Sequence, residues 1–124
     1  MKAKANKKVL IVDDSPAMRT ILRTIIGGTY DVVEADTRKQ GLWLFKKENP
    51  DLVLLDIVLS GGDEEGIRIL NEIRKADANA AVVIISAVGQ DSTISACKKL
   101  GAKDYIVKPF DEDYVLAVVK KHIG

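Results

Sequence analysis

The chain has 124 residues, a net charge of +1 at pH 7, 47% hydrophobic residues and 30% charged residues. This length corresponds to one domain, and the composition is that of an ordinary soluble globular protein. The nearly neutral charge gives no field that would attract nucleic acid or a membrane, so we expect neither as a direct partner. No apolar run approaches the roughly 18 residues of a membrane span, and no signal peptide is recognisable. Together with the single cysteine, these features predict a cytoplasmic protein without an internal disulfide.

Short apolar runs alternate with longer amphipathic stretches along the chain. The apolar runs predict strands at residues 9–12, 31–35, 52–55, 81–85 and 105–107. The amphipathic stretches predict helices at residues 16–26, 37–47, 63–75, 92–100 and from 111 onward. We therefore expect one α/β domain over residues 1–124, a doubly wound five-stranded parallel sheet with helices on both faces. Residues 1–7, which are rich in lysine, are expected to form a flexible tail.

Polar residues interrupt the apolar pattern where the predicted strands end: Asp13 and Asp14, Asp56, Ser86, and Lys108. The carboxyl ends of parallel strands lie on one edge of the sheet, where such folds bind ligands. Three carboxylates gathered there repel one another, so we expect a hard divalent cation such as Mg²⁺. The lysine can neutralise part of the charge when the metal is absent. A carboxylate beside such a cation can attack phosphorus and form an aspartyl phosphate.

Each of these residues has a plainer structural explanation when it is taken alone. Asp13 and Asp14 suit a helix cap, Ser86 suits a turn, and Lys108 suits a solvated surface. Asp56 is harder to explain in this way, because apolar residues flank it on both sides. The combination therefore favours phosphoryl chemistry over a set of unrelated structural roles.

Four motifs at the strand ends resemble the receiver domains of two-component response regulators: VLIVDD (9–14), DLVLLD (51–56), IISA (84–87) and YIVKPF (105–110). The resemblance covers essentially the whole chain. The stretches PAMR (16–19) and SAVGQ (86–90) are most similar to the single-domain chemotaxis regulators. The resemblance implies a single receiver domain with the flavodoxin-like receiver fold and the family's strand order, 2-1-3-4-5.

The resemblance also implies a phosphorylation site and a metal site. Asp56 would be the phosphoacceptor. Asp14 would bind Mg²⁺ directly, Asp13 would bind it through water, and the backbone carbonyl of Val58 would be the remaining protein ligand. Lys108 would bind a phosphoryl oxygen, and its peptide bond to the following proline is expected to be cis.

Two further residue pairs acquire roles from the same resemblance. Ser86 would bind another phosphoryl oxygen, and with Tyr105 it would form a switch in which the hydroxyl moves toward the phosphoryl group while the ring turns inward. Val58 and Val88 occupy the positions that tune hydrolysis in this family. Valine offers no hydrogen bond to an attacking water, so we expect slow self-dephosphorylation.

The implied function is a phosphorylation-activated switch in a two-component phosphorelay. A sensor histidine kinase would supply the phosphoryl group, a downstream protein would receive the signal, and a separate phosphatase is a possible third partner. The chain is not expected to be an enzyme with its own substrate, although it should catalyse its own Mg²⁺-dependent phosphorylation and slow dephosphorylation. The output face would comprise the fourth helix, fifth strand and fifth helix, with Ser95, Lys99, Lys103, Tyr105 and Tyr114.

Three other interpretations remain open. A flavodoxin-like nucleotide binder would need a glycine-rich loop after the first strand, where residues 13–16 read DDSP instead. A phosphatase with an aspartate nucleophile would need an acid at position 58. The chain could also be a receiver domain excised from a larger regulator that carries a separate output domain.

Some positions depart from the family pattern or stand outside it. The segment Leu59–Gly66 lacks the usual proline, and its glycine comes about two residues late, which predicts a longer loop before the third helix. Trp43 is expected at the surface or partly buried, and Cys97 in the core. His122 is expected to face solvent or to act as a charge at a helix end.

Overall fold

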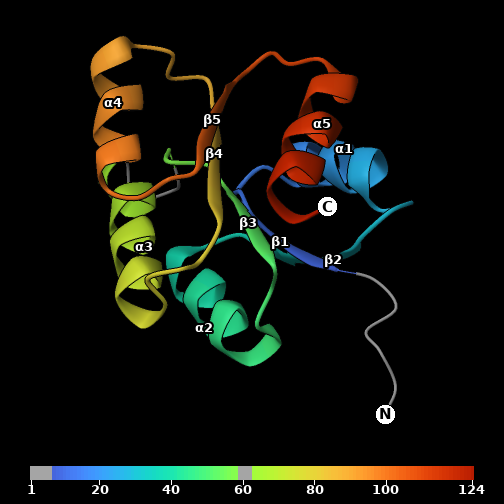
Figure 1. Cartoon of the computed structure of the whole chain (residues 1–124), viewed down its shortest axis with the longest axis horizontal. Coiled ribbons are helices and arrows are strands. Elements are labelled where there is room, and N and C mark those ends of the chain that lie inside the picture. The colour runs from blue at the N-terminus through green and yellow to red at the C-terminus, as the bar shows by residue number, and fades with distance from the viewer. Residues whose placement is uncertain (1–6, 59–62) are drawn as a thin grey trace.

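The computed structural model describes residues 7–58 and 63–124, and these residues form five strands that alternate with five helices (Figure 1). The strands are β1 Lys8–Val12, β2 Asp31–Ala35, β3 Leu52–Leu55, β4 Val82–Ser86 and β5 Asp104–Val107. The helices are α1 Pro16–Ile26, α2 Arg38–Glu48, α3 Asp63–Ala76, α4 Asp91–Lys99 and α5 Glu112–Ile123. Every predicted boundary agrees with these bounds to within one residue.

Two expectations fall wholly or partly outside the described residues. The predicted tail at residues 1–7 lies there except for Lys7. The predicted loop at Leu59–Gly66 is described only from Asp63 onward, where α3 has already begun and includes Gly66. The length and shape of this loop therefore stay predictions.

All five strands are parallel, and their order in the sheet is β2-β1-β3-β4-β5, which confirms the predicted fold class. The order reverses between β1 and β3, where doubly wound sheets bind ligands. In register, Val12 lies beside Leu55, and Ser86 lies beside Val107. The residues that follow these strands therefore emerge together at one edge.

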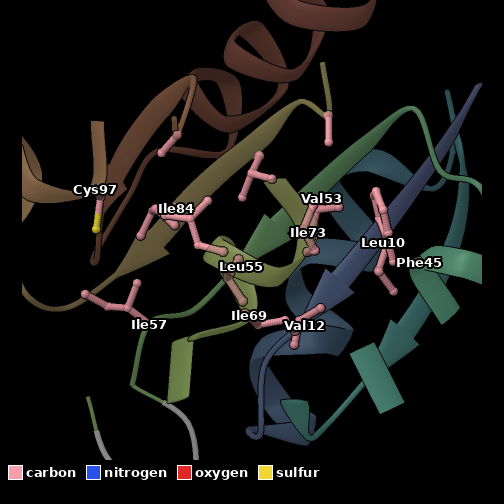
Figure 2. Close-up of a cluster of buried hydrophobic side chains, with 14 of the residues drawn as sticks. Leu10, Val12, Phe45, Val53, Leu55, Ile57, Ile69, Ile73, Ile84 and Cys97 are labelled. Atoms are coloured by element: carbon pink, nitrogen blue, oxygen red, sulfur yellow. The ribbon is translucent and has the colours of Figure 1, made fainter. Parts of the chain in front are cut away.

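Two hydrophobic clusters hold the layers together. Helices α2, α3 and α4 cover one face of the sheet, and α1 and α5 cover the other (Figure 1). Figure 2 shows the first cluster, in which Leu10, Val53 and Ile84 of the sheet point toward Phe45, Ile73 and Cys97 of the helices. Strands β3 and β4 are buried at every position, which explains their unbroken apolar runs.

Three residues outside the strand-end motifs can now be placed. Trp43 is 57% exposed and lies beside the Lys47 ammonium, 4.6 Å from the ring centre. Cys97 is fully buried, as predicted. The first alternative for His122, a side chain facing solvent, was wrong, because its side chain is only 16% exposed and its Nε2 lies 3.1 Å from Asp104 Oδ2. This contact forms because the last turn of α5 packs beside the start of β5. His122 does lie in the last turn of α5, as the second alternative expected.

Within the described ranges, none of the helices combines the length and apolar character that crossing a membrane requires.

Candidate functional site

Three charged side chains meet at the carboxyl edge of the sheet, and we call them the charged cluster: Asp13, Asp56 and Lys108. The Lys108 ammonium lies 3.2 Å from Asp13 Oδ2 and 3.0 Å from Asp56 Oδ2. Asp13 is fully buried, Asp56 is 6% exposed, and the lysine side chain is 17% exposed. A single partly buried ammonium thus bridges two buried carboxylates, which is the neutralising role that the sequence predicts for this lysine.

The sheet itself places these residues. Each one continues the hydrogen-bond ladder by one step beyond its strand: Asp13 N–H donates to the Ala35 carbonyl at 3.0 Å, Asp56 N–H to Val12 at 2.9 Å, and Lys108 N–H to Ser86 at 2.8 Å. Their backbone positions are therefore as well defined as those of the strands. The peptide bond between Lys108 and Pro109 is cis, as predicted.

Both carboxylates are also oriented by a local backbone donor. Asp13 Oδ1 accepts from the Ser15 N–H at 2.9 Å, and Asp56 Oδ1 accepts from the Val58 N–H at 2.9 Å. In each case the second oxygen is the one that contacts the lysine. Ser15 rather than either aspartate caps α1, since its hydroxyl oxygen accepts from Met18 N–H at 3.2 Å.

Burial and charge shift the protonation equilibria of the cluster. Burial raises the pKa of Asp13 above its usual value, and the neighbouring charge of Asp56 acts in the same direction. Burial alone would lower the pKa of Lys108, but its hydrogen bond to Asp56 and the charges of both aspartates outweigh this and raise the pKa. The lysine therefore stays charged, and with both acids ionised the cluster carries one surplus negative charge.

Asp14 differs from the charged cluster in its exposure to solvent. It follows Asp13 directly, but its side chain is exposed. Among the side chains that the structure describes, those of residues 7–58 and 65–124, no group of three acidic, histidine or cysteine side chains is close enough to hold a metal ion. The carboxylate oxygens and the surplus negative charge nevertheless suit a hard cation such as Mg²⁺, which prefers oxygen ligands and keeps several waters. The donor chemistry therefore fits, although two of the three predicted carboxylates are gathered and the third lies beside them.

A second group lies next to the charged cluster, and we call it the switch group: Ser86, Val88 and Tyr105. Ser86 is fully buried at the end of β4, and its hydroxyl oxygen accepts from Val88 N–H at 3.2 Å. The Tyr105 hydroxyl donates to the carbonyl of the same valine. The ring is 7% exposed, and burial raises the pKa of Tyr105. The tyrosine thus already occupies an inward position.

Comparison with known proteins decides the family. The family model for the response regulator receiver domain matches residues 9–120. The chain belongs to the receiver domain family.

Curated relatives and solved structures agree with this assignment. Chemotaxis protein CheY of Bacillus subtilis is 40% identical over 119 residues, which span 94% of this chain and 98% of the relative. Sporulation initiation phosphotransferase F of the same organism is also 40% identical, over 95% of this chain and 94% of the relative. A CheY-like receiver domain from Methanospirillum hungatei has a TM-score of 0.88 at 27% identity, with 96% and 94% of the two chains covered.

A further solved structure contains a bound metal and a partner. It is the CheX–CheY complex of Borrelia burgdorferi with BeF₃ and Mg²⁺. Its matched chain has a TM-score of 0.86 and 34% identity, with coverage of 93% of this chain and 87% of that chain. The protein is therefore a CheY-like receiver domain of two-component signalling.

The two valines predicted to tune hydrolysis in this receiver domain lie in different surroundings. Val58 is 38% exposed and follows Asp56 by two residues. Val88 is half-buried and packs against the cluster shown in Figure 2. If Val88 shields the site from an attacking water, it does so with a side chain that the core holds in place, whereas Val58 faces solvent.

Two residues near the site were not assigned a role from the sequence. Gly66 packs so closely that a Cβ there would lie 2.1 Å from the Ile57 Cα, so only glycine lets α3 approach the segment after Asp56. A glycine inside a predicted helix is the signal that could have revealed this contact. Arg19 contacts the backbone of Asp13, and a contact to a carbonyl leaves no pattern in the sequence.

Proposed function

We propose that this receiver domain is a phosphorylation-operated switch in which Asp56 accepts a phosphoryl group from a sensor histidine kinase, with Mg²⁺, and passes the signal to a protein target. The observation that carries the proposal is the charged cluster, in which Lys108 bridges Asp13 and Asp56. Burial of two like charges beside one ammonium is unfavourable for stability and is typical of a functional site.

The chemical step is a displacement at phosphorus. A carboxylate oxygen of Asp56 forms the new P–O bond while the P–N bond of the donor phosphohistidine breaks, and the histidine nitrogen keeps the electron pair. Such transfers depend mainly on positioning and on charge neutralisation. Lys108 is already within hydrogen-bond distance of Asp56 and can bind a phosphoryl oxygen. The Ser86 hydroxyl can donate to another.

The metal site would use Asp13, Asp14, Asp56 and the backbone carbonyl of Val58. Magnesium, when bound, would supply positive charge beside the phosphoryl oxygens. The buried Asp13 would hold it from the sheet side, and the exposed Asp14 would approach from the solvent side. The Borrelia burgdorferi CheY complex, which contains Mg²⁺ and BeF₃, supports magnesium as the metal.

The switch group supports a route for the signal. The backbone of Val88 is bonded on both sides, because its N–H donates to Ser86 and its carbonyl accepts from Tyr105. When the Ser86 hydroxyl turns toward a phosphoryl oxygen, the loop that carries Val88 must adjust, and the tyrosine is tied to that loop. Phosphorylation would therefore favour one state of an existing equilibrium, with the inward ring as the favoured state.

Partners follow from this scheme. The kinase and the target would act in the cytoplasm, where two-component phosphorelays operate. Because Val58 and Val88 offer no side-chain hydrogen bond to water, self-dephosphorylation would be slow, and a separate phosphatase would set the lifetime of the signal. First-order loss of phosphoryl label should be faster in the double variant Val58→Asn, Val88→Glu; an unchanged rate would contradict the shielding argument.

A second arrangement is favoured by one specific relative. A C4-dicarboxylate response regulator of Bacillus subtilis, DctR, is 34% identical over 97% of this chain but only 54% of its own length is covered. Such a relative carries further sequence beside its receiver. The same Asp56 switch would then control an attached output domain in place of a separate target.

The proposal is tested by phosphorylation from a small donor. Incubation with acetyl phosphate and Mg²⁺ should add one phosphoryl group to the protein, detected as a mass increase in an intact-mass spectrum. Asp56→Asn should gain none, while Asp51→Asn, at the start of the same segment, should react like the wild type. A base-labile phosphoryl group on the Asp56→Asn protein would overturn the assignment.

A further inference from the structure

Arg19 links α1 to the turn that carries both N-terminal aspartates. Its Nη1 donates to the backbone carbonyl of Asp13 at 2.6 Å, and its side chain is only 17% exposed. Its Nε donates to Glu34 Oε1 on β2 at 3.1 Å. The arginine therefore spans from the helix to the edge strand and binds the turn on the way.

Glu34 anchors this arginine together with a second one. The other carboxylate oxygen of Glu34 accepts from Arg23 Nε at 2.6 Å, and Arg23 is the more exposed of the two arginines. The planar guanidinium of Arg19 can contact a carboxylate and a carbonyl at once because its donors point in fixed directions. Arg23 shares the anchor through its Nε, which donates to that carboxylate.

The carbonyl that Arg19 binds belongs to the peptide group joining Asp13 to Asp14. The N–H of Asp13 is bonded to Ala35, and its carboxylate to Ser15 and Lys108. With the carbonyl also held, rotation of this peptide group is restricted. The plane of that group sets the direction in which the Asp14 side chain leaves the backbone.

We propose that Arg19 is a positioning residue for the magnesium site, which it serves by fixing the peptide group between Asp13 and Asp14. This inference rests on the proposed function, since it concerns the same metal site. Groups that hydrogen-bond behind metal ligands orient them, and their loss commonly weakens metal binding about tenfold or more.

The charge of Arg19 and its hydrogen bond predict opposite changes in magnesium affinity when the residue is replaced. A guanidinium near the site repels a divalent cation, so removing it would tighten magnesium binding if charge alone mattered. Removing the hydrogen bond to the Asp13 carbonyl would weaken magnesium binding if positioning matters. The sign of the change therefore separates the two roles, and a change in stability without a change in affinity would indicate a purely structural one.

The test is the magnesium affinity of the unphosphorylated full chain, measured from backbone amide chemical shifts during titration with MgCl₂. Arg19→Met should raise the dissociation constant about tenfold. Arg23→Met is the matched control, since it also removes one charge and one contact to Glu34, and its affinity should stay within about twofold of the wild type. Arg19→Lys keeps the charge but not the planar fork, so it should also bind more weakly than the wild type.

The outcomes distinguish this inference from the proposed function. If Arg19→Met, or Arg19→Lys where the first variant does not fold, binds magnesium as tightly as Arg23→Met or more tightly, the positioning role is overturned while the proposed function stands. If the wild-type protein shows no saturable magnesium shifts around Asp13 and Asp56, both are overturned. Weaker binding confined to the Arg19 variants supports the inference.

Discussion

The charged cluster and the switch group lie at the same edge of the sheet but are held in different ways. Asp13, Asp56 and Lys108 are fixed by ladder hydrogen bonds and by ion pairs among themselves. Ser86 and Tyr105 are joined through the backbone of one loop residue, Val88. The first group is rigid and brings like charges together, whereas the second depends on hydrogen bonds that contribute about 1 kcal/mol each. In the proposed function, the charged cluster would act on an element that a small free-energy change can shift.

The largest effect is expected where the charged cluster loses its only ammonium among the described residues. In Lys108→Met the carboxylates of Asp13 and Asp56 stay buried without their bridge, which should lower the free energy of unfolding by about 3 kcal/mol at pH 7. Phosphorylation should be lost as well. Lys98→Met, on the exposed side of α4, is the control and should change stability by less than about 0.5 kcal/mol. Urea denaturation measures both, and equal stability of the two variants would show that the bridge is unimportant.

The second prediction is that removing a negative charge from the same cluster stabilises the protein. Asp13→Asn keeps an acceptor for Ser15 N–H but removes a buried charge, so it should raise the free energy of unfolding by about 1 kcal/mol at pH 7 without magnesium. Asp14→Asn, one residue along and exposed, should change it by less than about 0.5 kcal/mol.

The dependence of stability on pH follows from the direction in which the pKa of Asp13 is shifted. Its pKa in the folded state is raised, so the folded protein disfavours the ionised form and the unfolded chain does not. The contribution of Asp13 to the free energy of unfolding is therefore fully present at a pH below the pKa of Asp13 in the unfolded chain. It is lost as the pH rises through the pKa of Asp13 in the folded protein. The advantage of Asp13→Asn should grow as pH rises from about 4 to 7. Parallel pH profiles for the variant and the wild type would contradict the assignment.

The smallest predicted effect tests the hydrogen bond of the switch group. Tyr105→Phe removes the bond to the Val88 carbonyl and should lower the free energy of unfolding by about 1 kcal/mol. Tyr30→Phe is a matched control, because the buried hydroxyl of Tyr30 has no hydrogen-bond partner among the described residues. That variant should be neutral or slightly more stable. Thermal or urea unfolding of the pair would contradict the account if Tyr30→Phe were the more damaging change.

Much of this structure was predictable because it follows from the spacing of apolar residues and from which residues stand directly after the strands. The unbroken apolar run at residues 52–55 predicts a strand covered on both faces, and Asp56 must then emerge at its carboxyl end. The same reasoning places Asp13 and Lys108 together. It does not say which of two adjacent aspartates points inward, because successive side chains leave the backbone in different directions.

Other features depend on contacts between distant segments and could not be predicted. His122 reaches Asp104 only because α5 packs back against β5. Arg19 binds a backbone carbonyl, which no residue type signals. The inward position of Tyr105 depends on the conformation of the loop at Val88, and local sequence does not determine that conformation.

The most direct measurement of the central claim is a titration of the protein with Mg²⁺ and beryllofluoride, a mimic of the phosphoryl group, followed by backbone amide chemical shifts. The account predicts that the wild type shifts at Asp13 and Asp56 and also at Val88 and Tyr105. Ser86→Ala should keep the first pair of shifts and lose the second, because the charged cluster stays intact while its link to the loop is removed. Full shifts at Tyr105 in Ser86→Ala, or none there in the wild type, would contradict the claim that the two groups are coupled through Ser86.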